Sequence, residues 1–468
     1  MNINLNVAFL GFITILLTAC GGGGGGGSAS AVPTPVVPDD PSAEPLFDLF
    51  NSSHMVDVDG DGDLDIIIGI QNEKLEIASD LCLINDGKAN FTLKENAIPD
   101  HYLGKNGVTI SISSADFNKD SFQDLITITV DGRDASAYET AQIHLYLGVG
   151  DGTFTDATNN ISDSLHNEWP AFTRIGDFDL DGNLDFLLTK PGGEANEGRI
   201  YLNDGSANFA KANIVATDAE RSYSSTQLYW ESDGNTQAGR GSDRIALEVL
   251  IGDVNNDGNV DLVAPAGYAA GAMATYINKS TPGKLVFDLV YTVNAADPFD
   301  ETSLKRFKDG ALLDINNDGL LDMVGSNSIS QQDEEEVPIY TYLNNGDGSF
   351  TQSTDISGSG LEHARQWLVA DFNNDKLSDL FVADHGYDRH PFPGEKNLLL
   401  LNNGTGALVE RTATSLSTKS SYTHGASVGD LNGDGYPDLL LNHSSKDVDG
   451  RLWINDGDGT FTSKDLSI

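Results

Sequence analysis

Acidic residues recur along this chain at a spacing suited to holding metal ions. From residue 57 onward a nine-residue pattern returns seven times: Asp at the first position, Asp or Asn at the third, Asp at the fifth and ninth, and usually Gly at the sixth. Oxygen atoms at alternate positions of a tight turn converge on one centre, and Ca²⁺ takes about six to eight oxygens. The pattern predicts up to seven bound Ca²⁺ ions. A set of hydrated acidic turns is the alternative.

The expected ligands are the side chains at positions 1, 3, 5 and 9 and the backbone carbonyl at position 7. Copy by copy they are Asp57, Asp59, Asp61, Asp63 and Asp65; Asp116, Asn118, Asp120, Phe122 and Asp124; Asp177, Asp179, Asp181, Asn183 and Asp185; Asp253, Asn255, Asp257, Asn259 and Asp261; Asp314, Asn316, Asp318, Leu320 and Asp322; Asp371, Asn373, Asp375, Leu377 and Asp379; and Asp430, Asn432, Asp434, Tyr436 and Asp438.

Two copies depart from the pattern at position 6. Ser121 and Lys376 stand there in place of glycine. Glycine allows the sharp turn at no steric cost, whereas other residues are strained in a left-handed conformation. We therefore expect the second and sixth loops to be weaker or strained.

The elements around the loops follow from their repetition. The copies begin about 60 residues apart, and each lies between two short apolar runs. A third run follows, ending in Asn-Gly or Asp-Gly in most copies, and then a short run containing Phe, as in YLNNGDGSF at 342–350. Such runs and turns are typical of strands joined by tight hairpins. Four strands (A to D) in each of seven repeats predict an all-β, seven-bladed β-propeller with calcium-binding A–B hairpin loops. The seventh repeat contains all four strands, so closure needs no strand exchange.

These residues resemble the FG-GAP or VCBS-type repeat proteins, which include the propeller of integrin α-subunits. The resemblance covers roughly residues 50–465. It implies a propeller with calcium in the A–B loops. It does not imply one function, because adhesins, lectin-like modules and appendages of enzymes share these repeats.

The N-terminus is predicted to be an export signal. Residues 7–19 are apolar, too short a run to span a bilayer, and end in Leu-Thr-Ala before Cys20. This resembles the bacterial lipobox, which implies a signal peptide at 1–19 and a lipidated Cys20. A secretory signal with a chance cysteine, or a buried strand, is the alternative.

A tether and a body follow the cysteine. Residues 20–46 are rich in Gly and Pro, which favours a flexible or extended linker, and 47–468 form the predicted propeller. Gly21 is not aspartate, which by resemblance to lipoprotein sorting implies the outer membrane. The chain is therefore expected to be exported, lipid-anchored and exposed at the surface.

Charge excludes two classes of partner. With 71 acidic and 27 basic residues, the formal net charge is −44. Such a chain repels nucleic-acid phosphates and anionic lipid surfaces. We expect no nucleic-acid partner, membrane contact only through the lipid anchor, and a monomer.

Strand parity separates two faces of the propeller. Because chain direction reverses at each turn, the A–B loops and C–D turns share one face, here called the loop face. The B–C and D–A connections share the opposite face, where lengths and compositions vary as in ligand-binding loops. That face contains the insertion 221–243 and a cluster of histidines. The candidate ligand-binding residues are Trp230, His363, Arg365, His385, Tyr387, Asp388 and His424.

Three functions are compatible with these residues. The preferred hypothesis is a binding or adhesion module for an extracellular polysaccharide or protein. A polysaccharide lyase or hydrolase using the His/Arg/Tyr cluster, and a structural spacer in a surface assembly, are the alternatives. His and Asp on facing loops suit a transition-metal site or an acid–base pair, or are hydrogen-bonded loop residues. No catalytic residue is assigned, because the chain has no Gly-x-Ser-x-Gly, P-loop or His-Glu-x-x-His motif.

Overall fold

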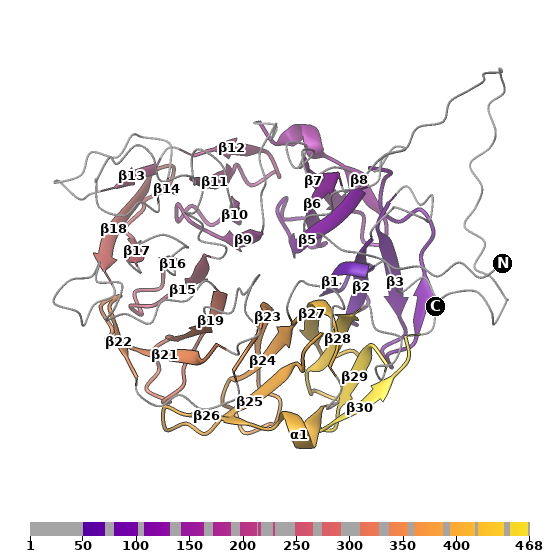
Figure 1. Cartoon of the computed structure of the whole chain (residues 1–468). Coiled ribbons are helices and arrows are strands. Elements are labelled where there is room, and N and C mark those ends of the chain that lie inside the picture. Colours follow the sequence, from indigo (N-terminus) through magenta and orange to yellow (C-terminus); the bar gives the residue numbers. More distant parts are fainter. Residues whose placement is uncertain are drawn as a thin grey trace, which may run out of the picture.

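Seven sheets stand around a common centre in the computed structural model (Figure 1). The structure describes residues 50–466 except for 71–78, 102–106, 132–141, 163–171, 189–196, 213, 217–227, 230–248, 265–273, 292–308, 327–336, 354–359, 387–393, 417–419 and 444–449. Within these residues, each sheet contains four consecutive strands that pair in chain order. The predicted seven-bladed β-propeller is therefore confirmed.

The strands of each blade are consecutive in the chain. Blade 1 has β1 (Phe50–Val56), β2 (Asp65–Ile70), β3 (Leu81–Asn85) and β4 (Phe91–Leu93); blade 2 has β5 (Gly107–Ala115), β6 (Asp124–Asp131), β7 (Gln142–Gly148) and β8 (Phe154–Asp156). Blade 3 has β9 (Thr173–Gly176), β10 (Asp185–Leu188), β11 (Glu197–Asn203) and β12 (Phe209–Lys211); blade 4 has β15 (Leu250–Gly252), β16 (Asp261–Ala264), β17 (Ala274–Asn278) and β18 (Leu285–Tyr291). Blade 5 has β19 (Asp309–Leu313), β20 (Asp322–Ser326), β21 (Ile339–Asn344) and β22 (Phe350–Gln352); blade 6 has β23 (Ala364–Ala370), β24 (Asp379–Asp384), β25 (Leu398–Asn402) and β26 (Leu408–Glu410). Blade 7 has β27 (Thr423–Gly429), β28 (Asp438–His443), β29 (Leu452–Asn455) and β30 (Phe461–Lys464).

Four further elements lie outside this pattern. β13 (Ile214–Ala216) pairs in parallel with β18, and β14 (Leu228–Tyr229) pairs with β11. A 3-10 turn, Thr158–Asn160, follows β8, and the short helix α1 (Thr412–Ser415) follows β26. Among the described residues no helix is long and apolar enough to cross a membrane.

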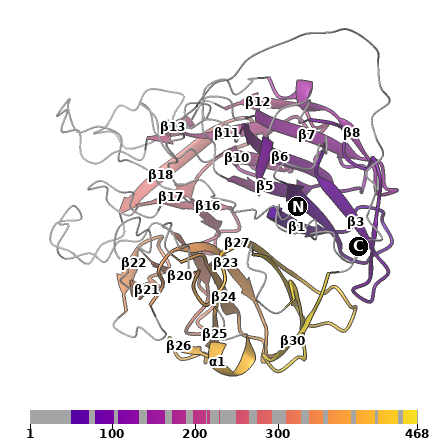
Figure 2. The same ribbon diagram turned by 45° about the vertical axis from the view of Figure 1, so that its right-hand side comes forward.

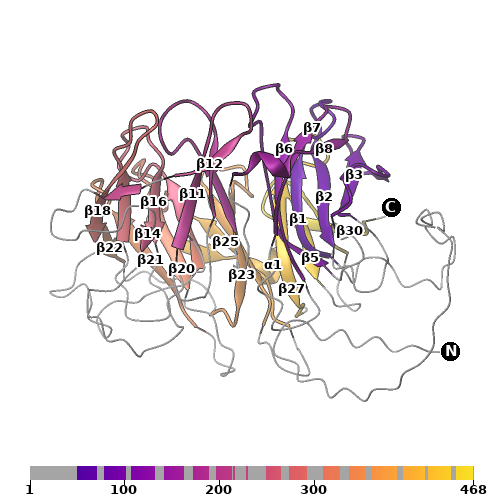
Figure 3. The ribbon, with the colours of Figure 1, turned by 90° about the horizontal axis from the view of Figure 1, so that it is seen from above.

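The first strand of each blade lies innermost, and the sheets extend outward from it (Figures 1 and 2). Seen from above, the strands run between the two faces of the disc (Figure 3). As predicted, blade 7 supplies its own four strands, so the seam between blades 7 and 1 closes without strand exchange. Side chains cross this seam: Ser53 Oγ lies 2.6 Å from Ser427 Oγ, and Lys464 Nζ donates to the carbonyl of Ala89 at 2.7 Å.

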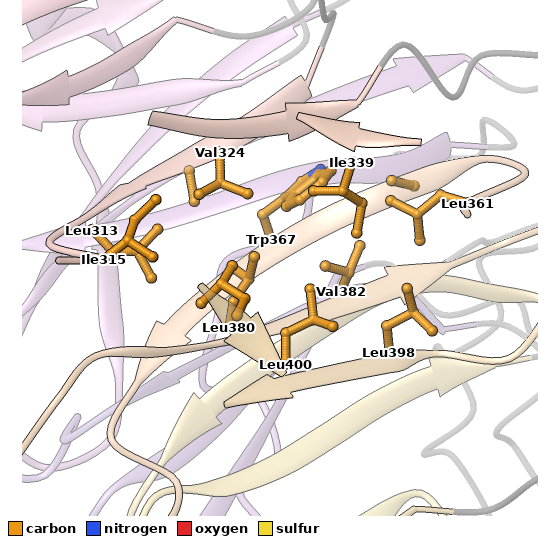
Figure 4. Close-up of a cluster of buried hydrophobic side chains, with 13 residues drawn as sticks. Leu313, Ile315, Val324, Ile339, Leu361, Trp367, Leu380, Val382, Leu398 and Leu400 are labelled. Atoms are coloured by element: carbon orange, nitrogen blue, oxygen red, sulfur yellow. The ribbon is translucent and has the colours of Figure 1, made fainter. Parts of the chain in front are cut away.

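Seven apolar clusters fill the seams between blades of the described structure, one in each seam, and a small eighth cluster of Val108 and Val130 lies within blade 2. Figure 4 shows the cluster between blades 5 and 6, where Trp367 packs among Leu, Ile and Val side chains. Each second strand lies between two seams, so both of its faces are apolar. Every residue of β2, β24 and β28 is buried for this reason. Sandwiched strands therefore give the short continuous apolar runs seen in the sequence.

One asparagine at the end of the third strand connects neighbouring blades. In blade 4, Asn278 Nδ2 donates to Val260 O in its own blade at 3.1 Å and to Phe178 O in blade 3 at 3.0 Å. Asn85, Asn203, Asn344, Asn402 and Asn455 make the corresponding pair of bonds in their blades. We call these six residues the strand-C asparagines.

Blade 2 has Gly148 at this position. A Cβ atom there would lie 2.3 Å from the carbonyl oxygen of Gln123, so no side chain fits. The amide of Gly152 donates to Val58 O in blade 1 at 3.1 Å, as Ala89 and Gly406 do at the equivalent positions of blades 1 and 6. This seam therefore has the backbone bond without the side-chain clamp.

Replacing Asn278 by Ala is expected to destabilise the propeller by about 2 kcal/mol or more, because two carbonyls in the seam lose their donor. Equilibrium unfolding in urea measures this change. Asn159→Ala, at an exposed position with no side-chain hydrogen bond in the described structure, is the control. Equal unfolding free energies for the two variants would show that the clamp contributes nothing.

Candidate functional site

The seven acidic loops fold around their own carboxylates. In the fifth loop, Asp314 Oδ1 accepts from the amide of Asp318 at 3.2 Å, and its Oδ2 accepts from Gly319 at 2.8 Å. Asp318 Oδ1 in turn accepts from the amide of Leu320 at 2.9 Å. These bonds turn the side chains of positions 1 and 5 inward over the loop. The sequence predicted that these oxygens converge on a bound ion, and that assignment of ligands stays a prediction.

Position 6 has a positive φ in every loop. The glycines there have φ between 85° and 95°, while Ser121 and Lys376 have φ of 76° and 73°. A Cβ at Gly62 or Gly182 would meet nothing within 4 Å, so the backbone angle is the only cost of a side chain. The expectation of strain in the second and sixth loops is met, because both non-glycine residues adopt a conformation that L-residues disfavour.

Position 4 also has a positive φ, which the sequence analysis did not predict. Lys119, Leu180, Asn256, Asn317 and Asn374 occupy it with φ of 56° to 62°. Three of the five are asparagine, the residue that tolerates this region best after glycine.

The aspartate at position 9 is buried and connects the loop to the third strand. In blade 5, Asp322 Oδ2 accepts from the amide of Ile315 at 3.0 Å, and Oδ1 accepts from Asn344 at 2.8 Å. The same two bonds recur in the other six loops. Burial raises the pKa of these carboxyls to about 6, and of Asp185 to about 7, although both amides lower it. The aspartate at position 9 therefore fixes the loop to the end of the third strand through protein hydrogen bonds alone.

The donor set suits a hard cation. Asp57, Asp59 and Asp61 each offer an oxygen within 4.8 Å of the others, and Asp177, Asp179 and Asp185 do the same. Burial, followed by the neighbouring carboxylates, raises the pKa of Asp59 and Asp179. Clusters of oxygens without nitrogen or sulfur fit Ca²⁺ better than a transition metal.

On the opposite face, side chains of blades 6 and 7 come together. His385 follows β24, while Tyr422 and His424 stand at the start of β27. The ring of His385 lies 3.6 Å from that of Tyr422 and 4.7 Å from that of His424, centroid to centroid. His363, just before β23, lies 5.2 Å from His385. We call these four residues, with Arg365, the inner cluster.

A buried carboxylate positions two members of the inner cluster. Asp384 accepts hydrogen bonds from the amides of Glu362, His363 and Gly386, each at 2.9 Å. The amide of His385 donates to His363 O at 3.0 Å. Burial raises the pKa of Asp384 to about 6, although the three hydrogen bonds from backbone amides lower it. Sequence analysis missed this residue, because one Asp at a strand end carries no signal of its own.

Two imidazoles of the inner cluster have lowered pKa values. Burial, and then the positive charge of Arg365, lowers the pKa of His424 to about 3 and that of His385 well below its usual value. Arg365 lies in β23 and is half-buried. It also acts on Asp309 in β19, whose pKa is raised by burial and lowered by Arg174 of β9 and then by a hydrogen bond from the amide of Gly310. Innermost strands of blades 3, 5 and 6 therefore contribute charged groups around one region of the opposite face.

The remaining predicted ligand-binding residues cannot be placed. Trp230, Tyr387 and Asp388 lie outside the described residues, as do Cys20 and the tether. Groups of three side chains able to hold a metal ion, among the residues described, occur in the acidic loops.

A second histidine pair lies between blades 1 and 2. His101 Nε2 is 3.6 Å from Asp80 Oδ2, and its ring lies 5.1 Å from that of His144. Burial, and then His101, lowers the pKa of His144 to about 4. No motif associates these residues, which are far apart in the chain and meet only across a seam.

Comparison with known families identifies the repeats. The model of the FG-GAP-like repeat matches residues 52–127, 131–188, 314–382 and 371–441, together more than half of the chain. The chain belongs to the FG-GAP-like repeat family. The fourth acidic loop of this FG-GAP-like protein, residues 253–261, lies between the matched segments, although its strands form a complete blade.

Similarity to individual proteins is distant. No curated protein matches this FG-GAP-like chain. Among solved structures it is similar to the Bacillus licheniformis rhamnogalacturonan lyase PL11, with 12% identity, a TM-score of 0.38, and coverage of 84% of this chain and 69% of that chain. BBS1N in complex with ARL6DN, soaked with mercury, gives 11% identity, a TM-score of 0.43, and coverage of 84% and 89%. No ligand or activity transfers at this level of similarity.

Ser121→Gly is expected to stabilise the protein by about 1 kcal/mol, because it relieves a left-handed serine. The reverse change in a glycine-containing loop, Gly182→Ser, should cost a similar amount at a site with open space around the new Cβ. Urea unfolding at a fixed calcium concentration measures both. Changes of the same sign in the two variants would contradict a purely backbone effect.

Proposed function

We propose that this FG-GAP-like protein is a calcium-stabilised binding module that recognises an extracellular polysaccharide through the opposite face. The observation that carries the proposal is the convergence of His385, Tyr422 and His424 from two blades beside Arg365. His385 and Tyr422 are buried, so in this proposal they position the partly exposed His424 and Arg365 rather than contact the ligand. An exposed ring edge or face can pack on a sugar, and a guanidinium forms paired hydrogen bonds with carboxylates and hydroxyls. A protein ligand is the other outcome of a binding screen.

Calcium is proposed to fill the acidic loops. Asp or Asn at positions 1, 3 and 5 would hold the ion together with the carbonyl of position 7, and the buried Asp of position 9 would fix the loop around it. The ion would supply positive charge to neutralise the clustered carboxylates, whose mutual repulsion otherwise opposes the folded loop. Its role in this proposal is structural.

Membrane attachment is proposed to depend on Cys20. The multiple acyl chains of a bacterial lipoprotein give stable anchoring, whereas one chain gives marginal binding. The Gly- and Pro-rich segment 20–46 would then hold the propeller away from an outer-membrane surface.

Cys20→Ser should move the protein from the membrane fraction to soluble or precursor forms, and unchanged fractionation with retained lipid label would refute the anchor.

A second candidate function is a polysaccharide lyase. The observation in its favour is that two imidazoles with lowered pKa stand beside Arg365 and Tyr422. A neutral imidazole can accept a proton from a sugar carbon while an arginine stabilises the adjacent carboxylate. Appearance of unsaturated oligosaccharides on incubation with uronate-containing polysaccharides would favour this function over binding alone.

Binding should be lost when the inner cluster is changed. Arg365→Gln and His424→Gln are expected to weaken binding of immobilised polysaccharides, found by screening neutral and uronate-containing polymers, by about tenfold or more. Lys88→Gln, an exposed change on the loop face, is the control and should bind as the parent does. Loss of binding only in Trp230→Ala would place the site at the insertion. Binding that survives both cluster variants and Trp230→Ala would refute the assignment to this face.

Chelation should lower the melting temperature by about 10 °C or more. A ligand that binds only the native state stabilises it by about 2.7 kcal/mol per site at a hundredfold excess over its Kd, and several loops contribute. Differential scanning fluorimetry with EGTA, against EGTA saturated with Ca²⁺, measures the shift. An unchanged melt in excess chelator would rule out exchangeable calcium.

A further inference from the structure

Blade 4 differs from the other blades in the residue that follows its third strand. This position lies on the loop face, next to the acidic loop of the same blade. It is occupied by Asp86, Val149, Asp204, Lys279, Asn345, Asn403 and Asp456 in blades 1 to 7. Only blade 4 has a cation there.

Lys279 reaches into the acidic loop of its own blade. Its Nζ lies 2.7 Å from Oδ2 of Asp257, the carboxylate at position 5 of the fourth loop. The lysine side chain is 45% exposed and that of Asp257 is 28% exposed, so the pair lies at the surface where ions from solution have access. The other oxygen of Asp257 accepts from the amide of Asn259 at 3.1 Å.

The contact has no counterpart in the other described loops. Among their acidic residues, none is ion-paired with a lysine or arginine. Lysines do occur within two of them, Lys119 in the second loop and Lys376 in the sixth, without forming such a pair. Among the described loops, the fourth alone therefore has a lysine ion-paired with one of its proposed calcium ligands.

We propose that Lys279 is a tethered competitor of the divalent cation, which makes the fourth loop bind Ca²⁺ more weakly than the other glycine-containing loops. The inference rests on the proposed calcium role of the loops. To bind calcium, Asp257 must exchange the ammonium for the ion, and the displaced ammonium remains close by on its short tether. A positive charge at this distance disfavours a second, divalent charge.

The position of the fourth loop gives its occupancy a wider effect. Asn256 Nδ2 donates to Gly319 O in the fifth loop at 3.1 Å. The amide of Gly283, in the same turn as Lys279, donates to Asp179 Oδ2 in the third loop at 2.9 Å. The fourth loop and its turn thus contact both neighbouring loops. Filling it at high calcium would therefore act on two seams between blades.

The test compares two lysines of one turn. Lys279→Asn introduces the residue that blades 5 and 6 have at this position, and Lys284→Asn removes the same charge from an exposed side chain without the contact. Native mass spectrometry at a series of buffered free Ca²⁺ concentrations counts the ions bound to each protein. We expect one ion of Lys279→Asn to bind at about tenfold lower free calcium than in the parent, with no change in Lys284→Asn.

A further variant assigns that ion to the fourth loop. Asp257→Ala should remove the shifted ion from the Lys279→Asn protein, while in the parent it should remove an ion that binds only at the highest concentrations. Superimposable titrations of parent, Lys279→Asn and Lys284→Asn, with several ions bound, would overturn the competitor role and leave the calcium role intact. No ion bound to any of the proteins would overturn the calcium role itself.

Discussion

A buried carboxylate at the start of each second strand holds the propeller together. Asp322 and its counterparts accept one amide from the acidic loop and one from the end of the third strand, inside a seam closed to water. The strand-C asparagine that supplies the second amide also reaches the neighbouring blade. In six blades, loop shape, sheet pairing and blade-to-blade contact therefore meet at one aspartate–asparagine pair. Loss of the aspartate leaves two backbone amides without their acceptor, and loss of the asparagine side chain leaves two seam carbonyls without their donor.

The two faces of the disc follow from this arrangement. On the loop face, short hairpins are held to nearly the same shape in every blade, so differences between them come from single side chains such as Ser121 and Lys279. On the opposite face, the described connections show no such repeated pair. Residues of different blades, such as His385 and Tyr422, meet there in a combination found once among the described residues. Recognition is therefore more easily built on that face, with the loop face acting as the rigid support.

Much of this architecture could be predicted from the sequence. The period of the acidic pattern, the apolar runs and the Asn-Gly turns led to seven blades with four strands each, and parity assigned the two faces. The asparagine clamp was not predicted, because asparagine before glycine is also an ordinary turn residue. The inner cluster was predicted as a set of residues on one face, but the contact of His385 with Tyr422 was not. It depends on how closely two blades approach: a Cβ at Gly394 would lie 2.4 Å from the backbone of Ser421.

Every blade is built from four consecutive strands. In the described structure, no four-stranded blade therefore combines strands from the two ends of the chain. The seam between blades 7 and 1 is held by the same kinds of side-chain contact as five of the six others. A chain cut at another connection between blades and joined at this seam would therefore retain all its sheets. By the same reasoning, duplication of one unit of about 60 residues adds a whole blade. Circular permutation and blade gain are thus compatible with this ring, in which each unit carries its own means of attachment to the next.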